Sequence, residues 1–406
     1  MTKNFDVIII GGGAAGFFAA INCAINYPKY KIAILEKNSK VLQKVLISGG
    51  GRCNVTNHCL DNRILVQNYP RGQKELLSVF NQFNVSQLIT WFEDRSVNIK
   101  LEPDGRMFPA TNSSQTIIDC FLDEVQKLNI LVLLKQNVKH VFNHDTNFEI
   151  ICDEDEYQAK YLIATNGGFH KLEHYTFLQQ LEHKIVKPIP SLFTFNITNH
   201  ILNNLMGVAV KNVVVKILES KHEFVGDLLI THWGFSGPVV LKLSSFAAID
   251  LSNLLYNYTI SINWINEKNN EAVKNTFLDF KDLHHLKNIE NALPFDLPKR
   301  LWNFFFEQIQ LDSNTKWAEV PNKKINALVE ILCNSQYKAL GKTTNKEEFV
   351  TSGGVDLKDV DMKTMQSKKV KNLFFAGEVL NIDGITGGFN FQSAWSTAYV
   401  AAQLNT

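Results

Sequence analysis

The chain has 406 residues, a formal net charge of +1 and 28 phenylalanines. This length indicates two or three domains, and the balanced charge gives no whole-chain signal for nucleic acid. Six cysteines at scattered spacings favour reduced thiols in a cytoplasmic protein over a disulfide framework. No stretch is long and apolar enough to span a membrane, and Asp6 with the glycines after it argues against a signal peptide.

The first predicted element is a buried apolar strand at residues 5–10, and a glycine-rich turn follows it directly. The turn has the G-x-G-x-x-G spacing of a dinucleotide-binding fingerprint. Its first glycine permits a tight turn, its second lets the backbone approach a pyrophosphate, and its third lets the next helix pack close to the strand. The helix is expected at 14–26, with its N-terminal amides directed at the phosphates. The cofactor-binding residues predicted here are Gly11, Gly13, Ala14, Ala15 and Gly16.

A second strand is predicted at residues 31–35, and it ends in Glu36. A carboxylate at this distance from the glycines accepts hydrogen bonds from an adenosine ribose and fits poorly with a 2′-phosphate. The order strand, turn, helix, strand and glutamate therefore predicts an FAD or NAD site that includes Glu36 and Lys37. The alternative is a glycine turn with an unrelated surface glutamate.

A second glycine-rich segment lies at residues 44–57 and contains Ser-Gly-Gly-Gly-Arg-Cys-Asn. Its glycines predict a loop that can lie flat against a planar ligand, and Gly51 is one of the expected contacts. Arg52 and Asn54 can donate hydrogen bonds to a flavin, to its phosphates or to an anionic substrate. Cys53 is a candidate proton donor or redox partner of a flavin, and the alternative is a small packing residue.

Between residues 74 and 175 the apolar spacing is less clear. Helices are expected at 74–95 and 115–128, and strands near 130–134, 138–142, 147–151 and 161–165. His170 and His174 are spaced like metal ligands on a helix, but no third ligand follows at a recognisable spacing. No metal site is therefore predicted.

The composition changes at Pro188 and marks a domain boundary. Short β-like runs between residues 191 and 265 predict an inserted antiparallel barrel or sandwich. Residues 267–337 predict a helical subdomain whose aromatic side chains form a core. His232, in the loop Thr-His-Trp-Gly, is a second candidate catalytic residue, as a proton donor or substrate ligand, and a structural loop histidine is the alternative.

The chain then returns to the first domain. A strand at 370–376 precedes a glycine and a glutamate, and a second glycine pair opens a last helix. The amides at the start of this helix can stabilise negative charge on a flavin, and the glutamate can hold the ribityl or pyrophosphate region. The cofactor-binding residues predicted here are Gly377, Glu378, Gly387, Gly388, Phe389 and Asn390.

Four stretches together resemble a known family: 48–57 (Ser-Gly-Gly-Gly-Arg-Cys-Asn-Val-Thr-Asn), 231–238, 351–355 and 375–390. The chain is similar in them to the bacterial BaiN/RdsA flavoproteins, also labelled aminoacetone-oxidase-like. The resemblance implies an α/β fold: a Rossmann-like, glutathione-reductase-like FAD-binding domain with a parallel sheet, an inserted antiparallel β-barrel and a small helical subdomain. The expected parts are 1–189 (FAD-binding, N-terminal part), 190–265 (barrel-like insert), 266–337 (helical subdomain), 338–350 (return through the insert) and 351–406 (FAD-binding, C-terminal part).

The resemblance also implies site residues. The adenine is expected to meet backbone near Val138. Thr165 and Gly167 correspond to an Ala-Thr-Gly-Gly motif that Asn166 interrupts in this chain. The segment at 169–175 departs from the family pattern, and we expect it to line the substrate side of the flavin.

The family reduces carbon–carbon double bonds with FAD, and NADH or NADPH serves as a transient reductant. The implied substrate is a uridine of large-subunit ribosomal RNA, which becomes dihydrouridine. Two alternatives stay open: a reductase or oxidase of a small metabolite, such as an enone or an amine, and a non-catalytic flavin-containing binding protein. A disulfide reductase is less favoured, because five residues separate Cys53 from Cys59 and no second nicotinamide-binding motif is found.

Overall fold

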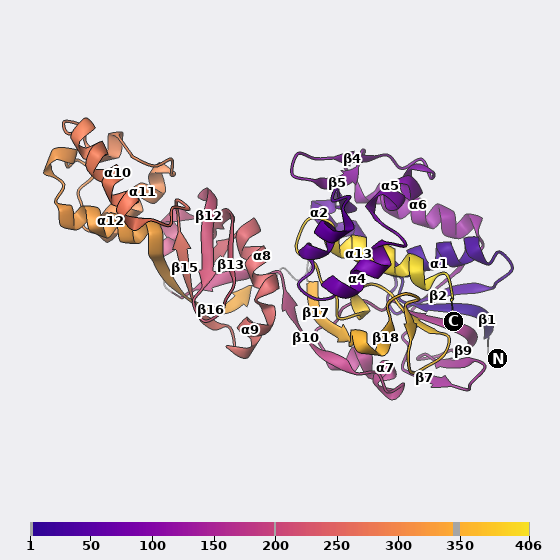
Figure 1. The fold of residues 1–406 in the computed structure, drawn as a ribbon. Helices are drawn as coiled ribbons and strands as arrows, with labels where there is room; N and C mark the ends of the chain where they lie inside the picture. Colours follow the sequence, from indigo (N-terminus) through magenta and orange to yellow (C-terminus); the bar gives the residue numbers. More distant parts are fainter. Residues whose placement is uncertain (1–2, 199, 344–349, 406) are drawn as a thin grey trace. The chain divides into compact units, whose positions relative to one another are not determined.

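The computed structural model describes residues 3–198, 200–343 and 350–405. The chain forms two compact units, and each is described by itself here (Figure 1). Unit 1 comprises Met1–Ser191 and Asn345–Thr406, and unit 2 comprises Leu192–Thr344. The predicted α/β class is confirmed: unit 1 contains a mostly parallel Rossmann-like sheet, and unit 2 contains a closed antiparallel barrel.

The main sheet of unit 1 has the strand order β18-β19-β20-β9-β1-β2-β6, with β8 added to β9 and β7 added to β8. The pairs that β1 makes with β2 and β9 are parallel, as are β2 with β6 and β20 with β9. The strands are β1 (Lys3–Ile10), β2 (Ile32–Glu36), β6 (Leu131–Leu134), β7 (His140–Asn143), β8 (Phe148–Ile151), β9 (Glu156–Ala164), β18 (Val360–Asp361), β19 (Gln366–Ser367) and β20 (Leu373–Phe375). The apolar residues at the end of β1 are buried, as expected for a central strand covered on both faces.

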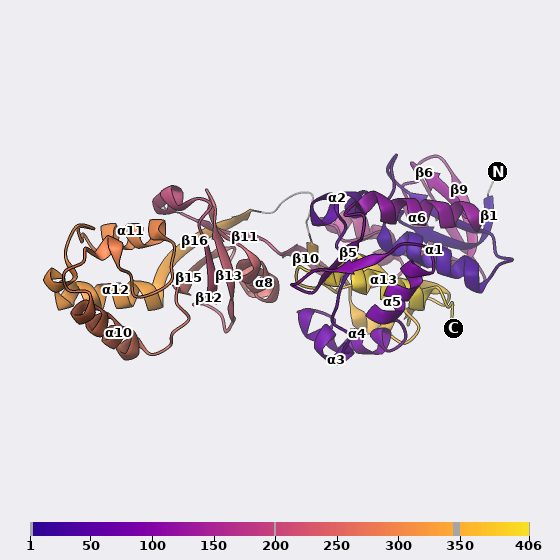
Figure 2. The same cartoon turned by 90° about the horizontal axis from the view of Figure 1, so that it is seen from above.

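Helices pack on this sheet, and α1 lies between α6 and α13 (Figure 2). The helices are α1 (Ala14–Asn26), α2 (Gln43–Gly51), α3 (Asn62–Leu65), α4 (Gln73–Phe80), α5 (Val85–Glu93), α6 (Ser114–Lys127), α7 (Thr176–Gln180) and α13 (Phe389–Ala401). The rings of Phe18 on α1 and Trp395 on α13 have centroids 5.4 Å apart. The single helix expected at 74–95 is two helices, because Asn84 starts α5 with a capping box to Gln87.

Two small sheets complete unit 1. In the first, β5 (Arg106–Pro109) pairs with β3 (Thr56–Asn57) and β4 (Ile99–Leu101). In the second, β10 (Ile185–Ser191) pairs antiparallel with β17 (Val350–Val355). The chain therefore leaves unit 1 from one strand of this pair and resumes in the other.

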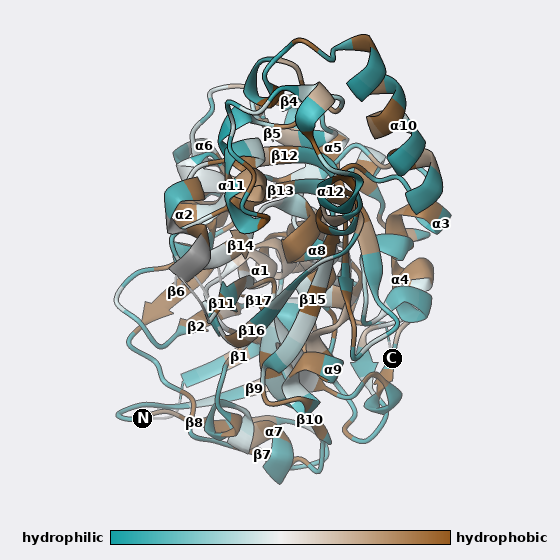
Figure 3. Ribbon diagram, turned by 90° about the vertical axis from the view of Figure 1, so that its left-hand side faces the viewer, coloured by the Kyte–Doolittle hydropathy of each residue, from teal (hydrophilic) through white to brown (hydrophobic). Residues whose placement is uncertain are grey.

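Unit 2 is built around a closed barrel with the order β11-β14-β13-β12-β15-β16. Its elements are β11 (Thr194–Ile197), β12 (Ala209–Ile217), β13 (Glu223–Ile230), β14 (Gly234–Ser236), α8 (Pro238–Phe246), α9 (Ala248–Asn253), β15 (Asn257–Asn263) and β16 (Ser335–Thr343). The β-like runs expected between residues 191 and 265 correspond to β11, β12, β13 and β15. Helix α8 is largely apolar (Figure 3) and buries Val240 and Leu243 in the barrel core.

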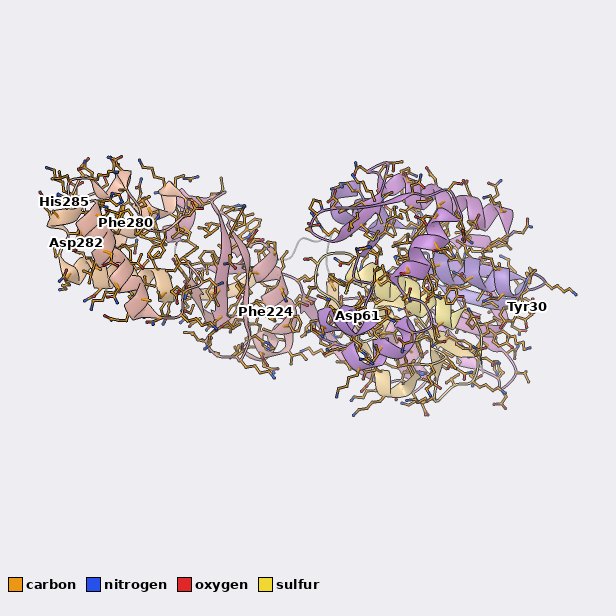
Figure 4. The ribbon with its side chains drawn as sticks, turned by 45° about the horizontal axis from the view of Figure 1, so that its top comes forward. Tyr30, Asp61, Phe224, Phe280, Asp282 and His285 are labelled. Atoms are coloured by element: carbon orange, nitrogen blue, oxygen red, sulfur yellow. The ribbon has the colours of Figure 1, made fainter. Side chains whose placement is uncertain are left out.

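Three further helices belong to unit 2: α10 (Asn270–Leu283), α11 (Lys299–Gln308) and α12 (Asn322–Asn334). Trp302 and Phe305 on α11 are fully buried, so the aromatic cluster is core, as predicted. Phe280 and Asp282 lie near the end of α10, close to His285 (Figure 4). Within the described parts of the chain, no helix has the length and apolar character needed to cross a membrane.

Candidate cofactor site

The first glycine turn is held tightly between β1, β2 and β9. Gly11 has φ +111°, and its amide donates to the Leu35 carbonyl over 2.8 Å. The Thr165 hydroxyl donates to the carbonyls of Ile10, at 2.9 Å, and Gly11. A Cβ atom at Gly16 would lie 1.9 Å from the Gly11 carbonyl oxygen. These contacts leave room only for glycine at position 16, and Thr165 supports the turn itself.

Gly13 occupies the open side of the same turn. A Cβ atom placed there would meet nothing within 4 Å. Gly13 is the N-cap of α1, and no side chain caps the helix. The first amides of α1, including those of Ala14 and Ala15, are therefore directed into a space that suits a phosphate group.

Glu36 is nearly buried, with 8% of its surface exposed. One carboxylate oxygen accepts from the Gly12 amide at 2.8 Å, and the other accepts from the backbone and side-chain nitrogens of Asn38 at 2.8 and 2.7 Å. The backbone after β6 runs alongside: the Lys135 amide donates to the Asn38 carbonyl, and the Gln136 amide donates to the Glu36 carbonyl. The stretch that leads to Val138 thus borders the carboxylate expected at the ribose.

The C-terminal glycine motif meets the first one. A Cβ atom at Gly377 would lie 2.8 Å from the Ala15 Cβ, and the Gly377 amide donates to the Thr397 hydroxyl on α13. Glu378 forms an ion pair with Lys44 of α2, with 2.6 Å between Oε2 and Nζ. Segments that lie far apart in sequence therefore converge at the start of α1.

The segment at 44–57, predicted as a loop, is helical at its start. It forms α2 until Ser48, where the backbone leaves the helical conformation. Gly49, Gly50 and Gly51 all have positive φ, and a Cβ atom at either of the last two would meet open space. The exposed backbone of these glycines is the part of the segment that can approach a flat ligand.

Arg52 and Asn54 are committed to protein partners. The Arg52 guanidinium pairs with Glu102, donates to Asn112 and lies 3.9 Å from the Phe108 ring centroid. With its amide oriented to satisfy its neighbours, Asn54 donates to the carbonyls of Thr56 and Met107 and accepts from the Gly388 amide. Their side chains shape the glycine segment, and this differs from the expected donation to a flavin.

The residues that open α13 also build structure with their side chains. The Asn390 side chain accepts from the Gly384 amide at 2.8 Å and donates to the Gly384 carbonyl at 2.9 Å. Phe389 is buried against Tyr69, and Asn57 donates to the Gly387 carbonyl. A Cβ atom at Gly388 would lie 2.4 Å from the Thr56 carbonyl. What remains for a ligand is the backbone of this turn.

Cys53 is fully buried in the core of unit 1 and has φ +57°. Its amide donates to the Ser48 carbonyl, and burial raises the pKa of its thiol to about 12. The thiol has no access to solvent beside the exposed glycines. This environment favours the packing role over the proton-donor role.

We therefore expect Cys53→Ala to leave both flavin half-reactions within twofold of the wild-type rates and to cost about 1 kcal/mol of stability from the lost packing. Stopped-flow absorbance of flavin reduction and reoxidation, with thermal unfolding, measures both effects. After unfolding, six thiols of the wild type and five of the variant should react with a disulfide reagent. A selective slowing of reoxidation by substrate would instead restore Cys53 as the acid.

His232 belongs to unit 2. It is exposed, and its ring centroid lies 3.9 Å from that of Trp233. The residues gathered around the first glycine turn all belong to unit 1. His232 as a catalytic residue stays a prediction.

The geometry fits a bound dinucleotide with a flavin. Both polar atoms of the Asn166 side chain are buried and have no hydrogen-bond partner among the described residues. Gly167 has φ +82° and open space beside its Cα. Together with the open faces of Gly13 and Gly51, these features leave room and buried polar groups that a bound FAD can use.

Sequence reasoning missed one buried group in unit 1. Asp383 is completely buried, pairs with Arg71 and accepts from the Ser191 hydroxyl at 2.6 Å. Asp383 lies in the C-terminal motif, but no local spacing connects it to the other two residues. Among the described residues, no three His, Cys, Asp or Glu side chains gather as metal ligands.

The family profile described as "HI0933-like protein Rossmann domain" matches residues 5–404. The chain belongs to this family. A protein of Escherichia coli K12 named ribosomal RNA dihydrouridine synthase is 30% identical, over 99% of this chain and 98% of its own length. A Haemophilus influenzae protein of the same name is 29% identical, over 99% of this chain and 98% of its own length.

A more distant relative is the 3-dehydro-bile acid delta(4,6)-reductase of Clostridium scindens, which is 24% identical over 97% of both chains. Among solved structures, 3-ketosteroid delta1-dehydrogenase from Sterolibacterium denitrificans covers 99% of this chain and 99% of its own, with a TM-score of 0.53 and 10% identity. That similarity supports the fold alone. Family and relatives together identify this chain as an FAD-dependent oxidoreductase.

Proposed function

We propose that this oxidoreductase uses NAD(P)H to reduce the carbon–carbon double bond of a uridine in large-subunit ribosomal RNA, giving dihydrouridine. The observation that carries the proposal is the full-length 30% identity to the Escherichia coli ribosomal RNA dihydrouridine synthase. The converging glycine segments of unit 1 supply the required FAD site. Action on ribosomal RNA also places the protein in the cytoplasm.

The chemistry that bound FAD would supply is hydride transfer from NAD(P)H to the electron-poor double bond. A proton completes the addition, so one hydride and one proton are consumed for each dihydrouridine, and NAD(P)⁺ is released. Glu36 would hold the adenosine ribose, and the first amides of α1 would hold the pyrophosphate. The amides that open α13 would stabilise negative charge on the flavin. The burial of Cys53 supports another group as the proton donor, and His232 is the sequence-based candidate.

A second candidate function is reduction of a double bond in a small metabolite. The similarity to the bile acid reductase of Clostridium scindens favours it, because that relative also aligns along nearly the whole chain. The same FAD site serves both functions. The difference lies in the substrate surface, for which unit 2 is our candidate.

Nucleoside mass spectrometry of large-subunit ribosomal RNA tests the RNA proposal. Cells lacking this gene should lose one dihydrouridine, and the wild-type gene should restore it. Complementation with Gly13→Ala, which should fold but bind FAD weakly, is the matched control and should fail. Unchanged dihydrouridine in the deletion strain would contradict the RNA proposal and direct the search to small enones. Comparing NADH with NADPH in flavin reduction identifies the reductant.

A further inference from the structure

The segment that departs from the family pattern lies beside Lys37. The Phe169 ring centroid is 4.2 Å from the Lys37 Nζ atom. The centroids of the Phe169 and His174 rings are 4.4 Å apart. Because Lys37 directly follows Glu36, these three side chains border the ribose end of the cofactor site, whereas the sequence placed this segment on the substrate side.

The segment is fixed in this position. The Phe169 amide donates to the hydroxyl of Tyr175 at 3.1 Å, and Tyr175 is fully buried. A Cβ atom at Gly168 would lie 3.0 Å from Thr351, so the backbone before the segment packs directly on β17. A chain that is anchored at both ends in this way can hold Phe169 in one place.

Backbone that follows β6 lines the opposite side of the Glu36–Asn38 stretch. The backbone at Lys135 and Gln136 is hydrogen-bonded to it, as described above. Lys37 is exposed, and among the described residues no carboxylate lies within ion-pair distance of its ammonium. An unpaired cation and an aromatic ring beside a ribose-binding carboxylate are suited to an electron-rich planar base.

We propose that Phe169, Lys37 and His174 form one wall of the pocket for the adenosine moiety of FAD, with the backbone at 135–138 as the facing wall. The altered segment therefore sets how tightly this chain holds its cofactor, and it leaves substrate choice to other residues. The proposal rests on FAD binding, which is common to both candidate substrates, and is independent of RNA.

The test measures binding of FAD, ADP and FMN to the apoprotein by calorimetry. Phe169→Ala should lower the affinity for FAD and for ADP by up to about tenfold. The affinity for FMN should not change, because only FAD and ADP carry adenosine. Lys37→Met should also lower the affinity for FAD and for ADP. Phe142→Ala removes an exposed phenylalanine of β7 and is the matched control, with all three affinities unchanged.

Thermal unfolding of each apoprotein shows whether the variants fold. If Phe169→Ala does not fold, Lys37→Met still tests the proposal. FAD and ADP affinities within twofold of wild type in both folded variants would overturn the proposal. A raised KM for substrate with unchanged FAD affinity would also overturn it and return the segment to the substrate side. Failure of the wild-type protein to bind FAD would refute the cofactor assignment, and a negative RNA result would leave the binding data intact.

Discussion

Replacing Gly16 by alanine is expected to destabilise unit 1 even in the absence of any cofactor. The added methyl group would lie 1.9 Å from the Gly11 carbonyl oxygen and 2.9 Å from the Thr165 hydroxyl. Alanine gains about 1 kcal/mol over glycine in a helix, but a backbone clash of this size costs about 3 kcal/mol or more. The steric cost therefore exceeds the helix gain, and the net loss should be about 2 kcal/mol.

Gly13→Ala is the matched control, because it adds the same methyl group three residues earlier where nothing lies within 4 Å. Gly13 also has a negative φ of −96°, so alanine causes no backbone strain. Apo Gly13→Ala should unfold at the wild-type temperature and bind FAD at least tenfold more weakly, because its methyl group points into the phosphate space. Calorimetric unfolding and FAD titration distinguish the two variants. Equal unfolding temperatures for the two apoproteins would contradict this account.

Arg71→Met is expected to cost about 3–5 kcal/mol of unit 1 stability. Asp383 has no exposed surface and the Arg71 side chain is 10% exposed, so removing the guanidinium leaves a buried carboxylate with only the Ser191 hydroxyl among its described side-chain partners. Adding Asp383→Asn removes that charge, and the double variant should recover a large part of the loss. Chemical denaturation of the wild type, the two single variants and the double variant measures the coupling.

The stability lost in Arg71→Met should also depend on pH. Burial raises the pKa of Asp383, and Arg71 opposes that rise. Without Arg71 the folded-state pKa moves higher, above the unfolded value, so the cost is complete above the folded pKa and is relieved as pH falls through it. The stability difference between Arg71→Met and wild type should therefore shrink below neutral pH. A difference that is constant between pH 7 and pH 5 would contradict the ion-pair explanation.

The parts of the site that the sequence predicts well are those set by local spacing. The glycines at 11, 13 and 16 act within one turn, and Glu36 follows at the end of the next strand. The spacing of these residues in the sequence is therefore enough to predict their arrangement. The fold class follows from the same order of strands and helices. The barrel strands β12 and β13, of nine and eight residues, are also visible, because their apolar pattern extends over enough residues, whereas the sequence does not predict β16 as a strand.

Side-chain roles that depend on distant partners are not predictable in this way. Arg52 has the donors that a flavin needs, but Glu102 and Asn112 use them instead. Asn54 accepts a hydrogen bond from the Gly388 amide, which is far away in the sequence. The burial of Cys53 depends on the assembled core. Short strands such as β14 have too few residues to show a period, so only their barrel neighbours define them.

The pairing of β10 with β17 has a consequence for how the protein is made. Unit 2 is continuous, so the ribosome can release it as a complete folding unit, whereas β20 and α13 of unit 1 are translated after it. At typical rates of synthesis, on the order of ten to forty seconds separate Leu192 from Leu373. During that interval β9 lacks β20, one of its two parallel neighbours, and α1 lacks α13. Cofactor loading is therefore expected to be a late event in biogenesis, and nascent chains stalled before Leu373 should retain no flavin.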